Sequence, residues 1–356
     1  MLSEGANPYR DEPLRSCEHA NRAWATLTSF VLAPLPPYAL ALLVPLAHLP
    51  YPQAGVLWFA LLVAAALVVI WAILELTSLP FLAVGAPIAV AVLLQSLPTG
   101  ALAPIPLALL TAGAVMLARK RWTSTAVLLA LSCIEPHVAI PAALAAFVLV
   151  PEMRARLAIA ALALLALSAI AGFGLSAEYF TSVLPAHARF ELGSIVQFGL
   201  SSMLHNFGVP DRTALAIGSV QYALFVVLGI WLAKSLRSLT PAAIVLAPIA
   251  LAVTGGVYIH LTQMAAALPL GFLAASKLRS ALPWLGITLL SLPWNLLEAF
   301  TPKTVTVPQF ADAVGKVIAH QATPGGLAYV ANTLAYLGIG SIFLAIALRP
   351  RPDRLR

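Results

Sequence analysis

The chain has 356 residues, of which 61% are hydrophobic and only 9% are charged. Soluble domains carry about 25% charged residues, so this composition excludes a water-facing surface over most of the chain and predicts lipid as its main solvent. The net charge of +7 is spread over short basic clusters and the two cysteines lie far apart, so we expect no nucleic-acid partner, no metal and no other cofactor.

In chain order, the sequence divides into three predicted parts. Residues 1–32 form an N-terminal loop, 33–348 a transmembrane domain and 349–356 a basic cytoplasmic tail. About 20 apolar residues cross a bilayer as a helix. Apolar runs of this length or somewhat shorter cover 35–48, 55–75, 79–97, 102–118, 157–175, 213–233, 239–254, 257–275, 281–299 and 327–348. We therefore predict an all-α, polytopic integral membrane protein with about 9–11 membrane segments.

Five basic clusters predict the orientation of these segments. They contain 13 of the 20 Lys and Arg residues and lie at 119–121, 154–156, 234–237, 277–279 and 349–356. Because cytoplasmic loops are enriched in Lys and Arg, we place all five on the cytoplasmic face. The loops 176–212 and 300–326 are then external. Counting back from residue 119 places residues 1–30 inside, although their nearly balanced charges do not decide the question.

The segment 122–151 has a basic cluster at each end and Glu135-Pro136-His137 at its centre. With both ends on the cytoplasmic face, the segment must enter the membrane and return, and Pro136 marks the turn. Each limb of about 13 to 15 residues spans roughly 20 Å, which is too short for a full crossing. An ionisable residue at that depth indicates a functional site. The alternative is one long, tilted helix in which Glu135 is hydrogen-bonded in a polar spot.

A second hairpin is predicted at 239–275, with Gly255-Gly256 at its turn. Tyr258, His260 and Gln263 follow this turn, and the i,i+3 spacing places His260 and Gln263 on one helix face. The alternative for His260 is a packed, hydrogen-bonding role without function.

Both predicted hairpins point outwards from cytoplasmic bases, towards the loop 176–212. Arg189 and Gln197 are the residues of this loop that we expect to matter. We therefore predict an external-side cavity in which Glu135, His137, His260 and the segment 189–197 approach one another. The sequence contains no motif of nucleotide binding, zinc hydrolysis or serine hydrolysis.

A series of weak motifs runs along nearly the whole chain. It begins with SEGANPYRDEPL and LAPLPPYALALLVPLAHLPYPQAGVLW and continues with LPTGALAPI, IEPHVAIP, VQFGLSSML and IHLTQMAAALP. In content and order, this series resembles the polyprenol-phosphate-dependent glycosyltransferases of family 87, which include bacterial mannosyltransferases. The resemblance implies a GT-C-like helix bundle in the cytoplasmic membrane, and it places the N-terminal loop outside.

The resemblance also implies a reaction. A mannose-like hexose would move from a polyprenyl-phosphate donor to a lipid or glycan acceptor at the extracytoplasmic face. A carboxylate would act as general base on the acceptor hydroxyl, and polar groups would stabilise the departing lipid phosphate. The expected catalytic residues are Glu135, His260 and Asp11. The expected substrate-binding residues are Asn7, Tyr9, His137, Arg189, Gln197, Tyr258 and Gln263.

The sequence departs from the family pattern in two places. The family's catalytic Asp lies in an external loop upstream of the Asn-Pro-Tyr element, whereas Met1 precedes Asn7 by only six residues here. Glu135 stands where the family usually has Lys, so an anion replaces a cation that pairs with phosphate. A catalytically inactive relative is therefore one alternative. A lipid or glycan transporter is the other, since broken helices that meet in mid-membrane are typical of transporters.

Overall fold

The computed structural model describes residues 7–9, 35–97, 100–192, 197, 199–255, 259–293 and 326–349. Every regular element within these ranges is a helix, so the predicted all-α class is confirmed. The first half of the chain contains α2 (Pro37–Ala47), α3 (Tyr51–Thr77), α4 (Phe81–Ile88), the π-helix η2 (Ala89–Leu94), α5 (Pro104–Ala118), α6 (Trp122–Ser132), α7 (Pro136–Leu149), the 3₁₀ turn η3 (Pro151–Met153) and α8 (Arg154–Ala171). The second half contains α9 (Phe173–Glu178), the π-helix η4 (Tyr179–Val183), α10 (Leu184–Leu192), α11 (Leu200–Asn206), α12 (Asp211–Leu236), α13 (Ala243–Gly255), α14 (Leu261–Met264), the 3₁₀ turn η5 (Ala265–Ala267), α15 (Leu268–Lys277), α16 (Leu282–Leu290) and α19 (Gly326–Ala347).

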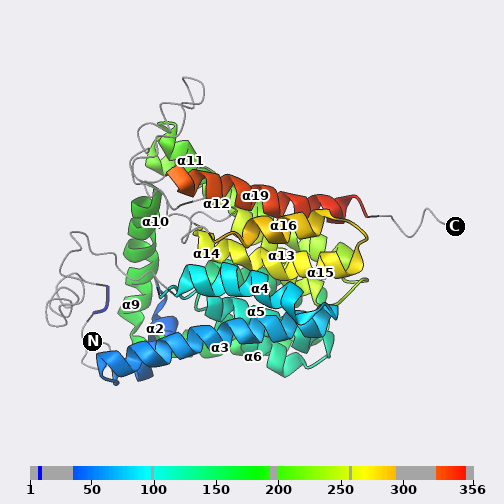
Figure 1. Ribbon diagram of the computed structural model, residues 1–356. Helices are drawn as coiled ribbons and strands as arrows, with labels where there is room; N and C mark the ends of the chain where they lie inside the picture. The colour runs from blue at the N-terminus through cyan, green and yellow to red at the C-terminus, as the bar shows by residue number, and fades with distance from the viewer. Residues whose placement is uncertain are drawn as a thin grey trace.

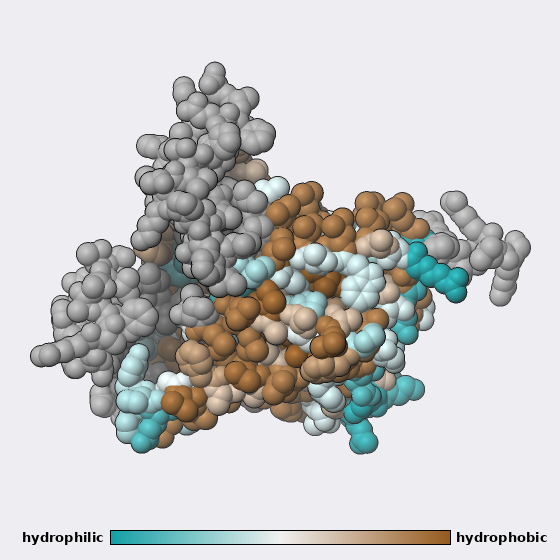
Figure 2. Space-filling view, viewed as in Figure 1, coloured by the Kyte–Doolittle hydropathy of each residue, from teal (hydrophilic) through white to brown (hydrophobic). Residues whose placement is uncertain are grey.

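Three helices are long and apolar enough to cross a membrane, namely α3, the continuous stretch of η3 and α8, and α12. Shorter apolar helices such as α5, α7 and α13 accompany them. Apolar residues cover most of the visible middle of the molecule, and hydrophilic residues gather towards its right end (Figure 2). The chain is therefore an all-α membrane protein.

Prolines fix where several of these helices begin and change. Helices α5 and α7 start at Pro104 and Pro136. A proline is tolerated at the first helical position because its missing N–H would have no partner there and its φ is already helical. Pro87 lies inside α4, where it removes a backbone hydrogen bond, and the π-helix η2 follows directly.

The bundle helices run alongside one another, whereas α9 and α10 cross one end of the bundle at a steep angle (Figure 1). Small residues allow close helix packing within the bundle. A Cβ on Gly286 of α16 would lie 2.5 Å from the carbonyl oxygen of Gly338 in α19. A Cβ on Gly229 of α12 would lie 2.8 Å from the Cα of Pro248 in α13. Such small-residue contacts are typical of helix pairs in membranes, where backbones approach closely.

The segment 122–151 forms the predicted hairpin. Helix α6 ends at Ser132 and α7 begins at Pro136, so the continuous-helix alternative is wrong. At the open end, Arg156 Nε donates a hydrogen bond of 3.2 Å to Thr123 Oγ1, which joins the start of α8 to the start of α6. The two ends of the segment therefore lie together, and the break at residues 133–135 is the tip. The depth of this tip in a membrane stays a prediction.

The second predicted hairpin also forms. The start of α13 and the end of α15 lie together, because Ala243 and Lys277 line one pocket. The break after Gly255 is therefore at the other end of the bundle. Its residues 256–258, which include Tyr258, lie outside the described residues.

The basic clusters of the described residues lie at one end of the bundle. Arg156 contacts Thr123, next to the cluster 119–121, and Arg349 Nη2 donates to the carbonyl oxygen of Ser235 at 3.1 Å. Lys277 and Arg349 line a common pocket with Leu236, and Lys234 lines another with Pro151. The common location that the sequence predicts is thus confirmed, whereas the side of the membrane stays a prediction.

The segment 176–212, predicted as an external loop, is largely helical. It contains the end of α9, η4, α10 and α11. Buried residues at 179, 183, 187 and 191 recur at helical spacing, so one face of η4 and α10 packs inwards. The helical structure places His187 and Glu191, two residues of the site described below, on this inward face.

Candidate functional site

Three interruptions in the helices meet at the end of the bundle opposite the basic clusters. They are the α6–α7 tip at Glu135, the break between α13 and α14 at Ile259-His260, and the segment between α10 and α11 that contains Gln197. Hydrogen bonds between Gln197 and Ile259, and between Gln263 and Glu135, join the three. Of the predicted approach of Glu135, His137, His260 and the segment 189–197, the contacts are present for the two histidines, Glu135, Glu191 and Gln197. Residues 193–196 lie outside the described residues, and a common cavity stays a prediction.

Gln263 organises the first group of residues, which we call the hairpin cluster (Glu135, His137 and Gln263). Its Oε1 accepts a hydrogen bond of 2.9 Å from the backbone N–H of His260. Because this bond fixes the orientation of the amide, Nε2 faces the hairpin tip, 3.0 Å from His137 Nε2 and 3.5 Å from Glu135 Oε2. An amide nitrogen has two hydrogens, so it can donate to both groups.

Gln197 organises a second group, the loop cluster (His187, Glu191, Gln197 and His260). Its Oε1 accepts a hydrogen bond of 2.8 Å from the backbone N–H of Ile259, one residue before the N–H that holds Gln263. Its Nε2 lies 2.6 Å from Glu191 Oε2 and 3.1 Å from His260 Nε2. The two glutamines thus repeat one arrangement, with the oxygen on a backbone N–H and the nitrogen between a glutamate and a histidine.

Glu191 is buried and contacts two histidines as well as Gln197. Its Oε1 lies 3.6 Å from His187 Nε2 and 3.9 Å from His260 Nε2. Burial lowers the pKa of His187 below its ordinary value, the nearby Glu191 carboxylate opposes this shift, and the neighbouring His260 adds to it.

The backbone of the hairpin tip is held from two sides. The Tyr222 hydroxyl of α12 donates to the carbonyl oxygen of His137 at 2.6 Å, and the Tyr38 hydroxyl of α2 donates to that of Cys133 at 2.7 Å. The Cys133 carbonyl lies at the end of α6, and the His137 carbonyl has no i+4 donor because Pro141 has no N–H. The two bonds therefore position Glu135, which lies between Cys133 and His137 in sequence.

Glu135 also lines a small pocket of about 10 Å³, which has room for about one hydroxyl-sized group. Thr262 and Gln263 contribute polar atoms, and the rest of the wall is apolar: Ala103, Pro106, Leu107, Val138 and Ala266. Glu191, in contrast, is buried against Gln197, His187 and His260. The two carboxylates therefore differ in their surroundings, although each contacts a glutamine amide.

The amino-terminal residues form a separate group against α9 and η4. Asn7 Nδ2 donates to Glu178 Oε2 at 2.6 Å, and the buried Tyr9 donates through its hydroxyl to the carbonyl oxygen of Leu35 at 2.6 Å. The rings of Tyr9 and Tyr179 lie 6.1 Å apart. Residues 7–9 therefore lie at the end of the bundle that carries α9, as the resemblance implies, and not at the basic end.

Comparison with protein-family models matches residues 35–259 to glycosyltransferase family 87. The match covers more than half of the chain. The chain belongs to glycosyltransferase family 87. No curated protein and no solved structure gives a significant match.

Membership in family 87 identifies the chain as a glycosyltransferase, which moves a sugar from a donor to an acceptor. The matched segment contains Glu135, His137 and Gln197 and ends one residue before His260. Asn7 and Tyr9 precede the matched segment.

Some of the expected family 87 site residues lie elsewhere. Arg189 is exposed on α10 and is not part of either cluster, because it lies on the outward face of that helix. Asn7 and Tyr9 contact α9 and η4 instead of the clusters. Asp11 and Tyr258 lie outside the described residues.

Four residues of the site were not among the sequence candidates, namely Tyr38, His187, Glu191 and Tyr222. The i,i+4 spacing of His187 and Glu191 is a signal for a shared helix face, and it is visible only if 176–212 is read as helical. Tyr222 has no such signal, because its role depends on the packing of α12 against the hairpin tip.

Proposed function

We propose that this family 87 member transfers a mannose-like hexose from a polyprenyl-phosphate donor to a lipid or glycan acceptor at the extracytoplasmic face of the cytoplasmic membrane. One observation carries the proposal. Two hairpin tips and α10 bring two glutamates and three histidines together at the end of the bundle away from the basic clusters. By the positive-inside rule, that end faces outwards. Residues 1–32 then belong outside and the tail 349–356 inside.

In this proposal Glu135 is the general base. Its carboxylate lines a pocket, so an acceptor hydroxyl can reach it, and Gln263 holds it in place. The acceptor oxygen attacks the anomeric carbon of the sugar, its proton passes to Glu135, and the bond from that carbon to the phosphate oxygen breaks. The lipid phosphate leaves with the electron pair. A positioned base of this kind contributes typically 10²–10⁴-fold to rate.

His260 and His137 are the proposed contacts of the departing phosphate. His260 has 34% of its side chain exposed while its Nε2 lies 3.1 Å from Gln197 Nε2, so part of the side chain remains accessible to a ligand. A histidine N–H that points at the phosphate would stabilise the negative charge that develops there. Glu191 Oε1 lies 3.9 Å from His260 Nε2 and would keep the His260 ring oriented.

A transfer assay tests the proposal. Purified protein in liposomes receives tritiated mannosyl polyprenyl phosphate and a membrane lipid extract as acceptor, and labelled product is measured. We expect His260→Ala to lower transfer at least tenfold without lowering the amount of protein. The matched control is His205→Ala, because the His205 ring contacts Asp211 at 3.0 Å outside both clusters.

The same liposomes separate the alternatives. Movement of the labelled lipid across the bilayer without a new glycosidic bond would indicate a transporter. Wild-type protein that neither transfers nor moves the label would indicate an inactive relative. Equal transfer by wild type and His260→Ala would leave His260 a packing role and contradict its assignment.

A further inference from the structure

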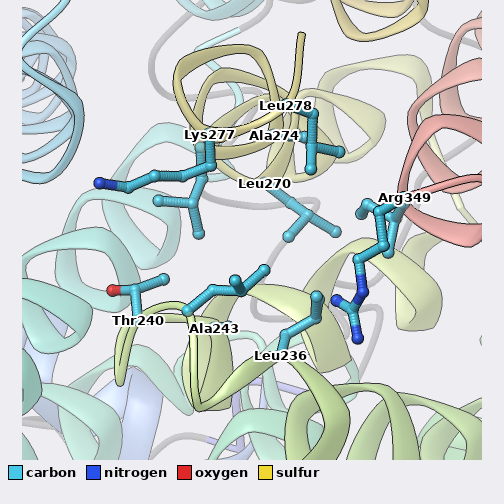
Figure 3. Close-up of a pocket in the computed structure, with 11 residues that line it drawn as sticks. Leu236, Thr240, Ala243, Leu270, Ala274, Lys277, Leu278 and Arg349 are labelled. Atoms are coloured by element: carbon cyan, nitrogen blue, oxygen red, sulfur yellow. The ribbon is translucent and has the colours of Figure 1, made fainter. Parts of the chain in front are cut away.

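A second pocket lies at the basic end of the bundle, far from both clusters. Its cavity volume is about 20 Å³, and residues at or near the ends of α12, α13, α15 and α19 line it. Leucine, isoleucine and alanine side chains form most of its wall. Lys277 and Arg349 stand on opposite sides of it, with Leu270, Ala243 and Leu236 between them (Figure 3).

The guanidinium group of Arg349 is only partly satisfied. Its Nη2 donates to the carbonyl oxygen of Ser235 at 3.1 Å. Its Nη1 is buried and has no hydrogen-bond partner among the described residues. A buried donor without a partner costs about 1–3 kcal/mol, and more when the group is charged. The position of Nη1 beside the pocket therefore favours an anion there.

The charges around the pocket favour the same conclusion. Lys277 is exposed at the rim, and no acidic residue of the described part of the chain lines the pocket. Glu75, an acidic residue at this end of the bundle, pairs with Arg119. The exposed Arg237 and Arg279 add positive charge nearby. Arginine and lysine around an apolar cavity match a ligand with an anionic head and an apolar body.

We propose that this pocket binds one anionic phospholipid of the leaflet at the basic end. The phosphodiester group lies at Arg349 Nη1, and Lys277, whose ammonium group points away from Arg349 (Figure 3), adds positive charge at the rim. One acyl chain packs against the apolar wall formed by Leu236, Leu270 and Ile346. The bilayer supplies such lipids at this depth, whereas free phosphate would leave the apolar wall unfilled. The site is independent of the sugar-transfer site, because it lies at the opposite ends of α12, α13 and α15.

Native mass spectrometry of the full chain tests this site. The protein is released from detergent with dioleoyl phosphatidylglycerol or with dioleoyl phosphatidylcholine, and the bound fraction is titrated. We expect one saturable phosphatidylglycerol site. Arg349→Gln and Lys277→Gln should each weaken it about fivefold, as one cation near a lipid headgroup contributes. The matched control is Arg279→Gln, which removes the same charge two residues from Lys277 but does not line the pocket.

Two further experiments identify the molecule that occupies the pocket. Ala274→Leu fills the pocket while keeping both cations and should weaken the lipid site, with thermal unfolding in detergent checking that the variant folds. Inorganic phosphate at millimolar concentration should not displace the lipid. Equal binding of the two lipids, displacement by phosphate, or an Arg279→Gln effect equal to that of Arg349→Gln would overturn the proposal. Tighter binding by Asp353→Asn would assign the pocket to the chain's own C-terminal residues, and that result would also overturn it.

Discussion

The hairpin cluster and the loop cluster contain the same three residue types in nearly the same arrangement, yet they differ in access. In each, a glutamine oxygen accepts from a backbone N–H at Ile259 or His260, and its nitrogen lies near a glutamate and a histidine. Glu135 lines a pocket, whereas Glu191 is buried among Gln197 and two histidines. The comparison indicates that Glu135 is placed to contact a substrate, whereas Glu191 is placed to orient a histidine.

The largest expected effect is on the rate of sugar transfer, and it distinguishes Glu135 from Glu191. Glu135→Gln keeps the size and hydrogen bonding of the side chain but removes the proton acceptor. We therefore expect transfer to fall by about 10²–10⁴-fold, the contribution of a general base. Glu191→Gln should lower transfer by about tenfold only, because it affects the orientation of His260 and not the proton transfer. Rates of transfer at saturating donor and acceptor measure both variants, and a larger loss for Glu191→Gln would reverse the assignment.

A smaller effect, on the stability of the fold, is expected from a substitution at Gly255. Gly255 ends α13 just before the N–H groups that hold the two glutamines, and a Cβ there would lie 2.8 Å from Cβ of Phe225 and closer still to its ring. Gly255→Ala must therefore displace Phe225 or the end of α13. We expect the free energy of unfolding to fall by about 1–3 kcal/mol, as overpacking does. Gly174→Ala in α9 is the matched control, since nothing lies within 4 Å of its added Cβ. Denaturation in detergent compares the two, and equal stability would contradict the close packing at Gly255.

The two clusters also differ in how far the sequence predicts them. Paired basic clusters and a central proline predict the hairpin at 122–151, because charge placement and helix breaking are local properties of the chain. This reasoning predicts Glu135 and His137, whereas Gln263 follows from the glycine turn at 255–256 and its i,i+3 spacing to His260. Glu191 and His187 were missed because helices α10 and α11 are short, and their burial depends on packing against the bundle. The sequence predicts Gln197 correctly, but Arg189, two residues after the buried His187 in α10, lies on the outward face.

Gln197 and Gln263 should also differ in how much each contributes to the stability of the fold. Replacing Gln197 by Leu leaves the N–H of the buried Ile259 without its acceptor, whereas Gln263→Leu does the same to His260, which is partly exposed. An unsatisfied buried donor costs about 1–3 kcal/mol, so Gln197→Leu should be the more destabilising change. Gln221→Leu is the control. Its Oε1 is already buried without a partner among the described residues, so its loss should be neutral or stabilising. Unfolding in detergent at fixed protein concentration measures all three.

The smallest expected effect is on the pH dependence of stability, and it arises from the loop cluster only. Burial lowers the pKa of His187, against the opposing effect of Glu191 and with a further lowering by His260. A histidine with a lowered pKa in the folded state binds its proton more readily when unfolded, so its contribution to stability is intact above about pH 6.5 and is lost as the pH falls. His187→Gln removes this group, and its melting temperature should decline less steeply than that of the wild type between pH 7 and pH 5. His205→Gln, which lies outside the cluster beside Asp211, should keep the wild-type slope. Parallel slopes for wild type and His187→Gln would mean that His187 takes up its proton without opposing the fold, and the buried contact with Glu191 would then be a charged pair.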